Sequence, residues 1–148
     1  MPEKQADGSF MLKQLSVFVE NEIGSLGKVT TVLRENGINL RAIASFDSPE
    51  FCILRMIVDK PESTKEILTH KGFVVKVTEV LAVELEDKPG ALDRVLHIIS
   101  EAKLCVNYIY SFVIRNEKTP LMVIHLDDMK EATTILKEHG IKVADQEE

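Results

Sequence analysis

An internal repeat of 66 residues constrains the fold of this chain more than any other feature of its sequence. At this shift, the aligned pairs include Leu15 with Leu81, Gly24 with Gly90, and Leu26 with Leu92. Past the middle of each repeat the shift becomes 68 residues, so that Gly72 aligns with Gly140. The repeat predicts two small units rather than one large domain. We expect a flexible N-terminal segment over residues 1–11, a first unit over residues 12–78 and a second over residues 79–145.

Alternating and helical patterns place the same elements in both repeats. In the first repeat, strands are predicted at residues 15–20, 38–46, 51–58 and 73–80, and helices at residues 25–36 and 61–72. In the second, strands are predicted at residues 81–86, 104–114, 121–126 and from 141, with helical stripes at 92–99 and 129–136 and a hairpin loop at 115–119. The order β-α-β-β-α-β predicts an α+β fold in which two helices cover one face of each antiparallel sheet.

The third strand of each repeat separates a helix-facing side from an outer side. Leu54, Met56 and Val58 are expected to face the helices, as are their counterparts Met122, Ile124 and Leu126. The outer side then carries Ile53, Arg55 and Ile57 in the first unit, and Leu121, Val123 and His125 in the second. So apolar a face predicts a homodimer through sheet faces or edges, or packing of sheet against sheet. The alternative is a solvated sheet with a few apolar residues.

A glycine-containing turn joins the first strand of each repeat to its first helix. The two turns read Asn-Glu-Ile-Gly-Ser-Leu over residues 21–26 and Asp-Lys-Pro-Gly-Ala-Leu over residues 87–92. Exposed N–H groups and about half a positive charge make a helix N-terminus suitable for a carboxylate or phosphate. In the alternative interpretation, Asn21, Ser25 and Asp87 only cap their helices, and the glycines serve only the geometry of the turn.

The second turn, followed by Val95 and Leu96 on the helix and by Ile109 in the next strand, resembles the ACT domain, whose first turn reads like D/N-x-P-G-x-L. The run from Gly37 to Leu40 also fits that family, and the resemblance extends from Leu12 to about Val143. It implies ferredoxin-like βαββαβ units that bind a small molecule, usually an amino acid, and regulate amino-acid metabolism. In paired ACT domains, the ligand commonly lies where the turn of one unit meets the second strand of its neighbour.

This resemblance implies two sets of ligand-binding residues. The turn positions are Asn21, Gly24, Ser25 and Leu26 in the first unit, and Asp87, Gly90, Ala91 and Leu92 in the second. The strand positions are Asn39 in the first unit, and Cys105 and Asn107 in the second. Ile23 stands where the family usually has proline, and Cys105 stands where Asn39 predicts an amide. Two sites of unequal quality are therefore expected.

No set of residues in the sequence indicates an enzyme. The four histidines, His70, His97, His125 and His139, form no HxxxH or HExxH motif and no recognisable catalytic set. Glu84 and Glu86 are expected on a solvated strand face rather than as an acid–base pair. No cofactor and no metal are expected, although a metal or oxyanion sensor that uses His125 and the turns remains a third alternative.

Charge and cysteine content limit the partners. The net charge of −6 argues against nucleic acid, and no apolar run is long enough for a membrane span. Cys52 and Cys105 both lie in apolar runs and are expected to be reduced core residues, which predicts a cytoplasmic location.

Two functional hypotheses follow. The first is a stand-alone tandem ACT protein, a regulatory sensor that binds a free amino acid between its units. The second is a non-catalytic regulatory subunit of an amino-acid biosynthetic enzyme, resembling the small subunit of acetolactate synthase, which acts by protein contact. The turns would contact only the ammonium and carboxylate groups that all amino acids share, so the sequence does not identify the ligand.

Overall fold

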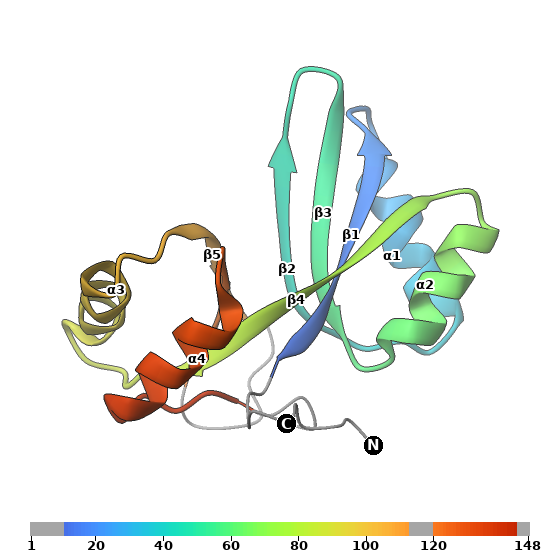
Figure 1. Ribbon diagram of the computed structural model, residues 1–148. Helices are drawn as coiled ribbons and strands as arrows, with labels where there is room; N and C mark the ends of the chain where they lie inside the picture. Colours follow the sequence, from blue (N-terminus) through green and yellow to red (C-terminus); the bar gives the residue numbers. More distant parts are fainter. Residues whose placement is uncertain (1–10, 113–119, 145–148) are drawn as a thin grey trace. The chain divides into compact units, whose positions relative to one another are not determined.

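The computed structural model describes residues 11–112 and 120–144, whose contacts divide the chain into two units (Figure 1). The N-terminal unit is Lys13–Thr78, and the C-terminal unit consists of the chain from Glu79 onward together with the start of the chain up to Leu12.

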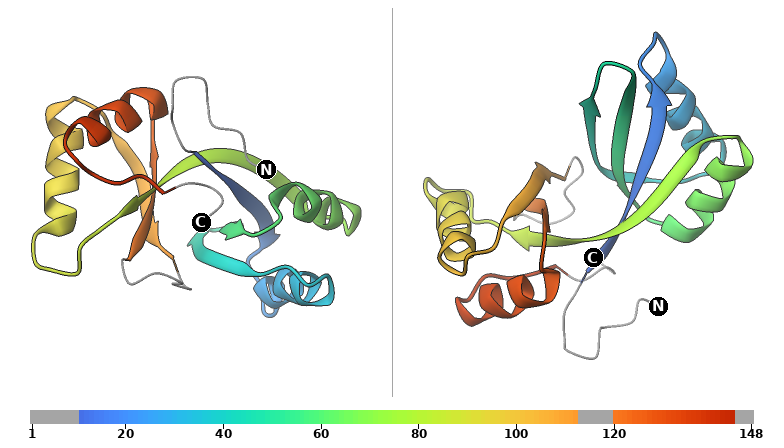
Figure 2. Two further views of the ribbon diagram at one scale, coloured as in Figure 1. Left: turned by 90° about the horizontal axis from the view of Figure 1, so that it is seen from below. Right: turned by 45° about the horizontal axis from the view of Figure 1, so that its top comes forward.

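The N-terminal unit is a βαββαβ sandwich of one sheet and two helices. Its elements are β1 (Leu12–Glu20), α1 (Ser25–Glu35), β2 (Leu40–Asp47), β3 (Phe51–Val58), α2 (Pro61–His70) and the first part of β4 (Val74–Glu84). The hydrogen-bonded order of the strands is β2-β3-β1-β4, and β3 pairs antiparallel with both β1 and β2. In both views of Figure 2, α1 and α2 (blue and green) lie on the same face of these strands.

The core of this unit follows the period of two in its strands. Leu15 pairs with Met56 and Val17 with Leu54, so alternate residues of both strands share one face. These residues form a buried cluster with apolar side chains of the two helices, which include Val29, Val32, Leu33 and Leu68. The prediction that residues 54, 56 and 58 face the helices is therefore confirmed.

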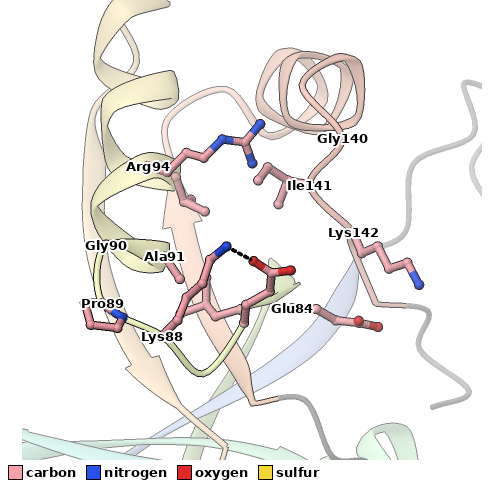
Figure 3. Close-up of a pocket in the computed structure, with 12 residues that line it drawn as sticks. Glu84, Lys88, Pro89, Gly90, Ala91, Arg94, Gly140, Ile141 and Lys142 are labelled. Carbon is pink, nitrogen blue, oxygen red and sulfur yellow. Dashed lines mark ion pairs between the residues drawn. The ribbon is translucent and has the colours of Figure 1, made fainter.

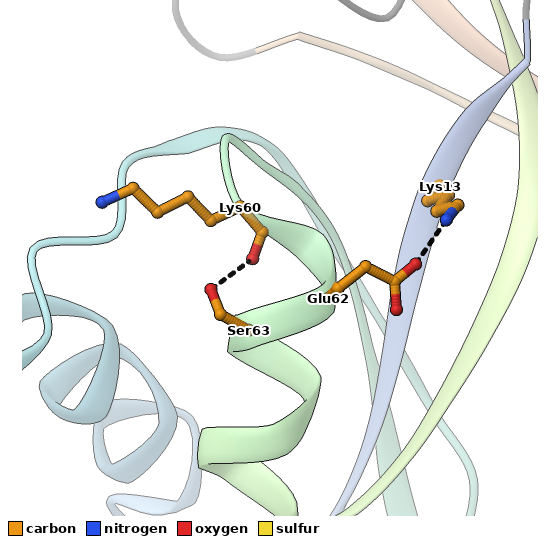
Figure 4. A network of polar contacts seen from close by, with 4 residues as sticks. All are labelled: Lys13, Lys60, Glu62 and Ser63. Carbon is orange, nitrogen blue, oxygen red and sulfur yellow. Dashed lines mark hydrogen bonds and ion pairs between the residues drawn. The ribbon is translucent and has the colours of Figure 1, made fainter. Parts of the chain in front are cut away.

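Helix α2 begins with proline, which tolerates the first helical position because it has no N–H group to leave unpaired. In its first turn, Ser63 Oγ donates a hydrogen bond of 3.4 Å to the carbonyl oxygen of Lys60 (Figure 4). Glu62 forms an ion pair with Lys13 of β1 and so joins helix to strand. The hydrogen bond from Lys13 and its positive charge lower the pKa of Glu62.

The C-terminal unit repeats this arrangement with a shorter sheet. It contains the second part of β4, α3 (Ala91–Glu101), β5 (Val106–Ser111), β6 (Leu121–Leu126) and α4 (Met129–Glu138), with strand order β4-β6-β5. Leu81 pairs with Ile124, and both lie in a buried cluster with Val95, Ile99 and Leu136. The fold class predicted from the sequence, α+β with two ferredoxin-like units and helices on one face of each sheet, is confirmed.

Several predicted strand bounds are wrong. Residues 73–80 and 81–86 are not two strands, because β4 runs without a break from Val74 to Glu84. The strand predicted at 104–114 is shorter, since β5 runs from Val106 to Ser111, and the whole hairpin loop predicted at 115–119 falls outside the described residues. The strand predicted from residue 141 is a single bridge between Val143 and Val83, flanked by a hydrogen bond of 2.7 Å from Ala144 N to Ala82 O.

The two cysteines differ in burial. Cys52 lies in β3 and is buried, as predicted, but Cys105 is exposed, so its assignment to the core is wrong. Cys105 precedes β5 in the connection from α3. In the part of the chain that the structure describes, no helix is long and apolar enough to cross a membrane.

Candidate functional site

The N-terminal turn is built on a glycine that an ordinary residue could not replace without strain. Gly24 has a φ of +84° and precedes the first residue of α1, Ser25, whose N–H donates to the carbonyl oxygen of Glu22 at 3.2 Å. No side chain caps the helix, so the capping roles considered for Asn21 and Ser25 are excluded. The Nδ2 of Asn21 instead contacts the carbonyl oxygen of Ser48 at 3.5 Å, in the β2–β3 hairpin.

The C-terminal turn has the same backbone. Gly90 has a φ of +90° and precedes Ala91, the first residue of α3, again without a side-chain cap. Capping is therefore excluded for Asp87 as well. Because the backbone conformation recurs, the differences between the turns lie in their side chains.

A pocket of about 500 Å³ opens at the C-terminal turn, a volume within the ordinary range for small-molecule sites. Three segments of the C-terminal unit line it: the end of β4, the turn with the start of α3, and the chain that follows α4 (Figure 3). The lining residues are Glu84, Leu85, Glu86, Lys88, Pro89, Gly90, Ala91, Arg94, Val95, Gly140, Ile141 and Lys142. Of the predicted site residues, Gly90 and Ala91 line the pocket.

An ion pair lies among the side chains of this pocket. Lys88 Nζ is 2.8 Å from Glu86 Oε1, and the hydrogen bond and charge of Lys88 lower the pKa of Glu86, with a smaller contribution from the positive charge of Arg94. Arg94 extends from α3 and donates a hydrogen bond of 2.7 Å to the carbonyl oxygen of His139. Figure 3 shows that the charged ends of Glu84 and Lys142 point away from the ion pair.

Apolar groups form the rest of the lining. They are Leu85, Pro89, Val95 and Ile141, and three of these also belong to or pack against the core of the unit. The lining thus combines two carboxylates, three cationic side chains and a hydrocarbon wall. Such a set can hold a small molecule with neighbouring charges of opposite sign and an apolar group.

In both units, an aspartate side chain accepts a hydrogen bond from the backbone of a predicted strand position. Asp59 Oδ1 accepts a hydrogen bond of 3.1 Å from Asn39 N, and Asp127 Oδ1 accepts one of 3.3 Å from Cys105 N. These backbone donors are therefore occupied. The side chain of Asn107 contacts His125 Nδ1 at 2.9 Å, and the ring of His125 stacks on Tyr108 with centroids 4.9 Å apart.

Within one unit, the turn and the strand positions lie at opposite ends of the sheet. Along β3, Val58 pairs with Leu40, next to Asn39, whereas Cys52 pairs with Val19, near the turn. Six residues of strand separate these ends by about 20 Å. Asn39 and Gly24 of one unit therefore do not contact the same small ligand, and the same topology separates Cys105 and Asn107 from Gly90.

The sequence did not indicate four of the charged residues in the pocket: Glu86, Lys88, Arg94 and Lys142. A signal was present in the repeat, because Lys88 aligns with Glu22 and Lys142 aligns with Val74. In an otherwise well-kept repeat, these changes of charge mark where the two copies differ. Over residues 11–112 and 120–144, no group of three potential metal ligands occurs.

Comparison with known proteins gave a family and several structures. Residues 10–148 match the family model described as an ACT domain pair. A crystal structure of a protein from Bacteroides thetaiotaomicron is similar, with a TM-score of 0.86 and 34% identity over 93% of this chain and 94% of the other. A search of curated proteins found no match.

Two structures share the fold at low identity. The regulatory subunit of aspartate kinase from Thermus thermophilus, in its ligand-free form, has a TM-score of 0.61 and 15% identity over 88% of this chain and 93% of the other. The corresponding subunit from Thermus flavus has a TM-score of 0.58 and 13% identity over the same shares.

Proposed function

The chain belongs to the ACT-domain family, and from this membership we propose that it is a non-catalytic sensor that binds a free amino acid and regulates amino-acid metabolism. ACT domains are regulatory amino-acid-binding modules, and the fold that carries them is present here twice. The amino acid binds one of two states of the protein more tightly than the other. Binding therefore changes the activity of a partner or the association of the chain.

The pocket at the C-terminal turn is the observation that supports amino-acid binding most directly. An α-amino acid carries a carboxylate and an ammonium group a few ångströms apart, next to a side chain. The pocket holds Glu86 and Lys88 at 2.8 Å from one another and adds an apolar wall. The proposal uses this pocket within the C-terminal unit, since every residue that lines it belongs to that unit.

Thermal unfolding in the presence of each of the twenty amino acids tests the proposal. At a concentration of ~100 times the Kd, a bound ligand adds about 2.7 kcal/mol to the free energy of unfolding. For a chain of this size, that corresponds to an increase of several degrees in Tm. If no amino acid raises the Tm and calorimetry detects no binding, the proposed function is wrong.

A second candidate function, a regulatory subunit that acts by protein contact, is favoured by one surface. Among the described residues, all the exposed large apolar side chains lie in the N-terminal unit: Ile23, Leu26, Phe51 and Val74. Phe51 pairs with Glu20 at the end of β1, and Ile23 follows three residues later in the turn. Ile23 is fully exposed, which has no benefit for the stability of the unit itself.

Purification from the native source, followed by measurement of the mass of the complex, tests this second candidate. The candidate is supported if an enzyme of amino-acid biosynthesis co-purifies in a stoichiometric amount and no longer does so with Ile23→Asp. Thr30→Asp, at an exposed position on α1, is the control. The same measurement on the isolated chain tests the homodimer that we propose through sheet faces or edges. A monomer mass at micromolar concentration contradicts that dimer.

A further inference from the structure

The Glu86–Lys88 ion pair is an unusual lining for a pocket, because it satisfies its own charges. The two side chains remain 74% and 64% exposed, respectively, and an ion pair so exposed contributes little to stability. Its partners can therefore separate when better partners arrive. Both residues line the pocket, and the dashed line in Figure 3 marks the ion pair that Lys88 forms there.

Arg94 adds a second positive charge to this group. Its hydrogen bond to the carbonyl oxygen of His139 fixes the guanidinium but joins it to a neutral acceptor, so its charge is not cancelled there. Arg94 lines the same pocket as the ion pair (Figure 3), and its positive charge makes a smaller contribution to the lowered pKa of Glu86. The lining thus holds two cations, Lys88 and Arg94, together with the carboxylate of Glu86.

The balance of these charges selects among possible ligands. A simple anion that binds Lys88 and Arg94 would stand beside the carboxylate of Glu86 and be repelled by it. A simple cation that binds Glu86 would be repelled by Lys88 and Arg94 in the same way. A zwitterion avoids both penalties, because its carboxylate faces the two cations while its ammonium group faces Glu86.

The remaining lining selects the side chain. Leu85, Val95 and Ile141 present hydrocarbon, and Val95 and the wall behind it belong to the core of the unit. The other charged residues of the lining, Glu84 and Lys142, direct their charged ends away from the ion pair (Figure 3). No charged partner is therefore aimed at the ligand's side chain from these two residues.

From these observations we infer that the ligand is an aliphatic α-amino acid. Its two charged groups separate the Glu86–Lys88 ion pair and become the new partners of these side chains. Its carboxylate replaces Glu86 as the partner of Lys88 and also faces Arg94, and its ammonium group binds Glu86. This inference rests on the proposed function and adds to it the class of the ligand and the contact that the ligand displaces. One ligand binds per chain, in the C-terminal unit.

Calorimetry with three matched probes tests the pairing of charges. L-leucine carries both charges, 4-methyl-2-oxopentanoate lacks the ammonium group, and 3-methylbutylamine lacks the carboxylate. We expect L-leucine to bind with a stoichiometry of one, and each of the other two to bind at least tenfold more weakly. Equal affinity for leucine and the keto acid would overturn the inference.

Two substitutions then separate the roles of the ion pair. Glu86→Gln is expected to weaken the binding of L-leucine at least tenfold and to strengthen that of 4-methyl-2-oxopentanoate, because it removes the competing carboxylate. Lys88→Met is expected to weaken the binding of both. The control is Lys103→Met, which removes another exposed lysine of the same unit at the far end of α3 and is expected to leave both affinities unchanged.

The outcomes distinguish this inference from the proposed function. If none of the twenty amino acids binds the wild-type chain, the proposed function fails and the inference fails with it. If amino acids bind but Glu86→Gln and Lys88→Met leave their affinities unchanged, the function stands and the pocket is the wrong site. If only amino acids with charged side chains bind, the assignment of the ligand class is wrong.

Discussion

The two strand–glycine–helix turns have nearly the same backbone and very different surroundings. Gly24 and Gly90 have φ values of +84° and +90°, and neither helix that follows has a side-chain cap. The charged residues around the C-terminal turn nonetheless align with other residue types in the N-terminal turn. Glu86, Lys88, Arg94 and Lys142 align with Glu20, Glu22, Lys28 and Val74, respectively.

These replacements reverse the local charge. The C-terminal turn has three cations and one carboxylate at these positions, whereas the N-terminal turn has one cation and two carboxylates. With these charges, a ligand carboxylate is attracted to the C-terminal turn and repelled by the N-terminal turn. The N-terminal turn instead exposes Ile23 where the other has Pro89. The duplication thus kept a backbone that only glycine adopts easily, while side chains around it diverged.

The largest expected effect comes from core truncation. Met56→Ala in the N-terminal unit and Ile124→Ala in the C-terminal unit each remove a fully buried side chain and should each cost about 2–5 kcal/mol. Hydrogen exchange followed by mass spectrometry is expected to show lost protection in β1 and β3 for the first variant, and in β6 for the second. Equal loss along the whole chain from either variant would show that the two repeats unfold as one body.

A charge transplant tests the contrast between the turns directly. Lys88→Glu with Lys142→Val gives the C-terminal turn the residues of the N-terminal one, and we expect at least a tenfold loss of amino-acid affinity by calorimetry, or about 1.4 kcal/mol. Glu22→Lys in the other turn is the matched control and should leave that affinity unchanged. An affinity lost with Glu22→Lys instead would place the ligand at the N-terminal turn.

Substitution of each glycine by alanine tests the backbone conformation of the turn separately from the side chains around it. A Cβ atom at Gly24 or Gly90 would meet no atom within 4 Å, so only the positive φ opposes it. Each substitution should lower the free energy of unfolding by about 1–2 kcal/mol in urea titrations. We expect similar losses of stability in both variants and a loss of amino-acid binding only in Gly90→Ala. Binding that declines equally in both variants would contradict the comparison.

The smallest expected effect concerns titration on the first helix of each unit. Helix α3 carries Asp93 and His97 at positions where α1 has Gly27 and Thr31. The hydrogen bond of His97 to the carbonyl of Asp93, with the carboxylate of that residue, raises the pKa of His97. A raised pKa adds stability that is complete below the pKa of the unfolded chain and disappears as the pH rises through the folded value.

Asp93→Asn should therefore lower the pKa of His97, as followed by NMR titration. It should also reduce the difference in stability between about pH 5 and pH 8. An unchanged pKa in this variant would mean that the carboxylate has no part in the shift.

Most of the fold was predictable because its signals are local or repeated. The alternation of residues 54–58 and the helical stripe that includes Val29 and Leu33 place the core correctly, as the buried cluster confirms. The ends of the strands were harder to predict where the pairing between strands decides them, rather than the pattern of residues along the sequence. Residues 73–86 carry a nearly continuous strand pattern, yet two strands were predicted there, and the structure has one strand, β4, from Val74 to Glu84.

The candidate site was predictable only in part. The glycine turns are visible in the sequence, and the structure places Gly90 and Ala91 in the wall of a pocket. Asn39 and Cys105 were assigned to the site through family resemblance, as strand positions that meet the turn of a neighbouring unit. Within their own units they lie at the end of the sheet opposite the turn. The exposure of Cys105 was also missed, because an apolar neighbourhood in sequence does not guarantee a covering helix in space.

By itself, the sequence determined the duplication, the fold of each unit and the positions of the two turns. Those follow from periodicity and from glycine's unique tolerance of positive φ, which act over a few neighbouring residues. Only the tertiary structure decided that Glu86, Lys88, Arg94 and Ile141 meet around one pocket. They come from a strand end, a turn, a helix and a distant connection, and such a meeting depends on packing between elements rather than on any local preference of the chain.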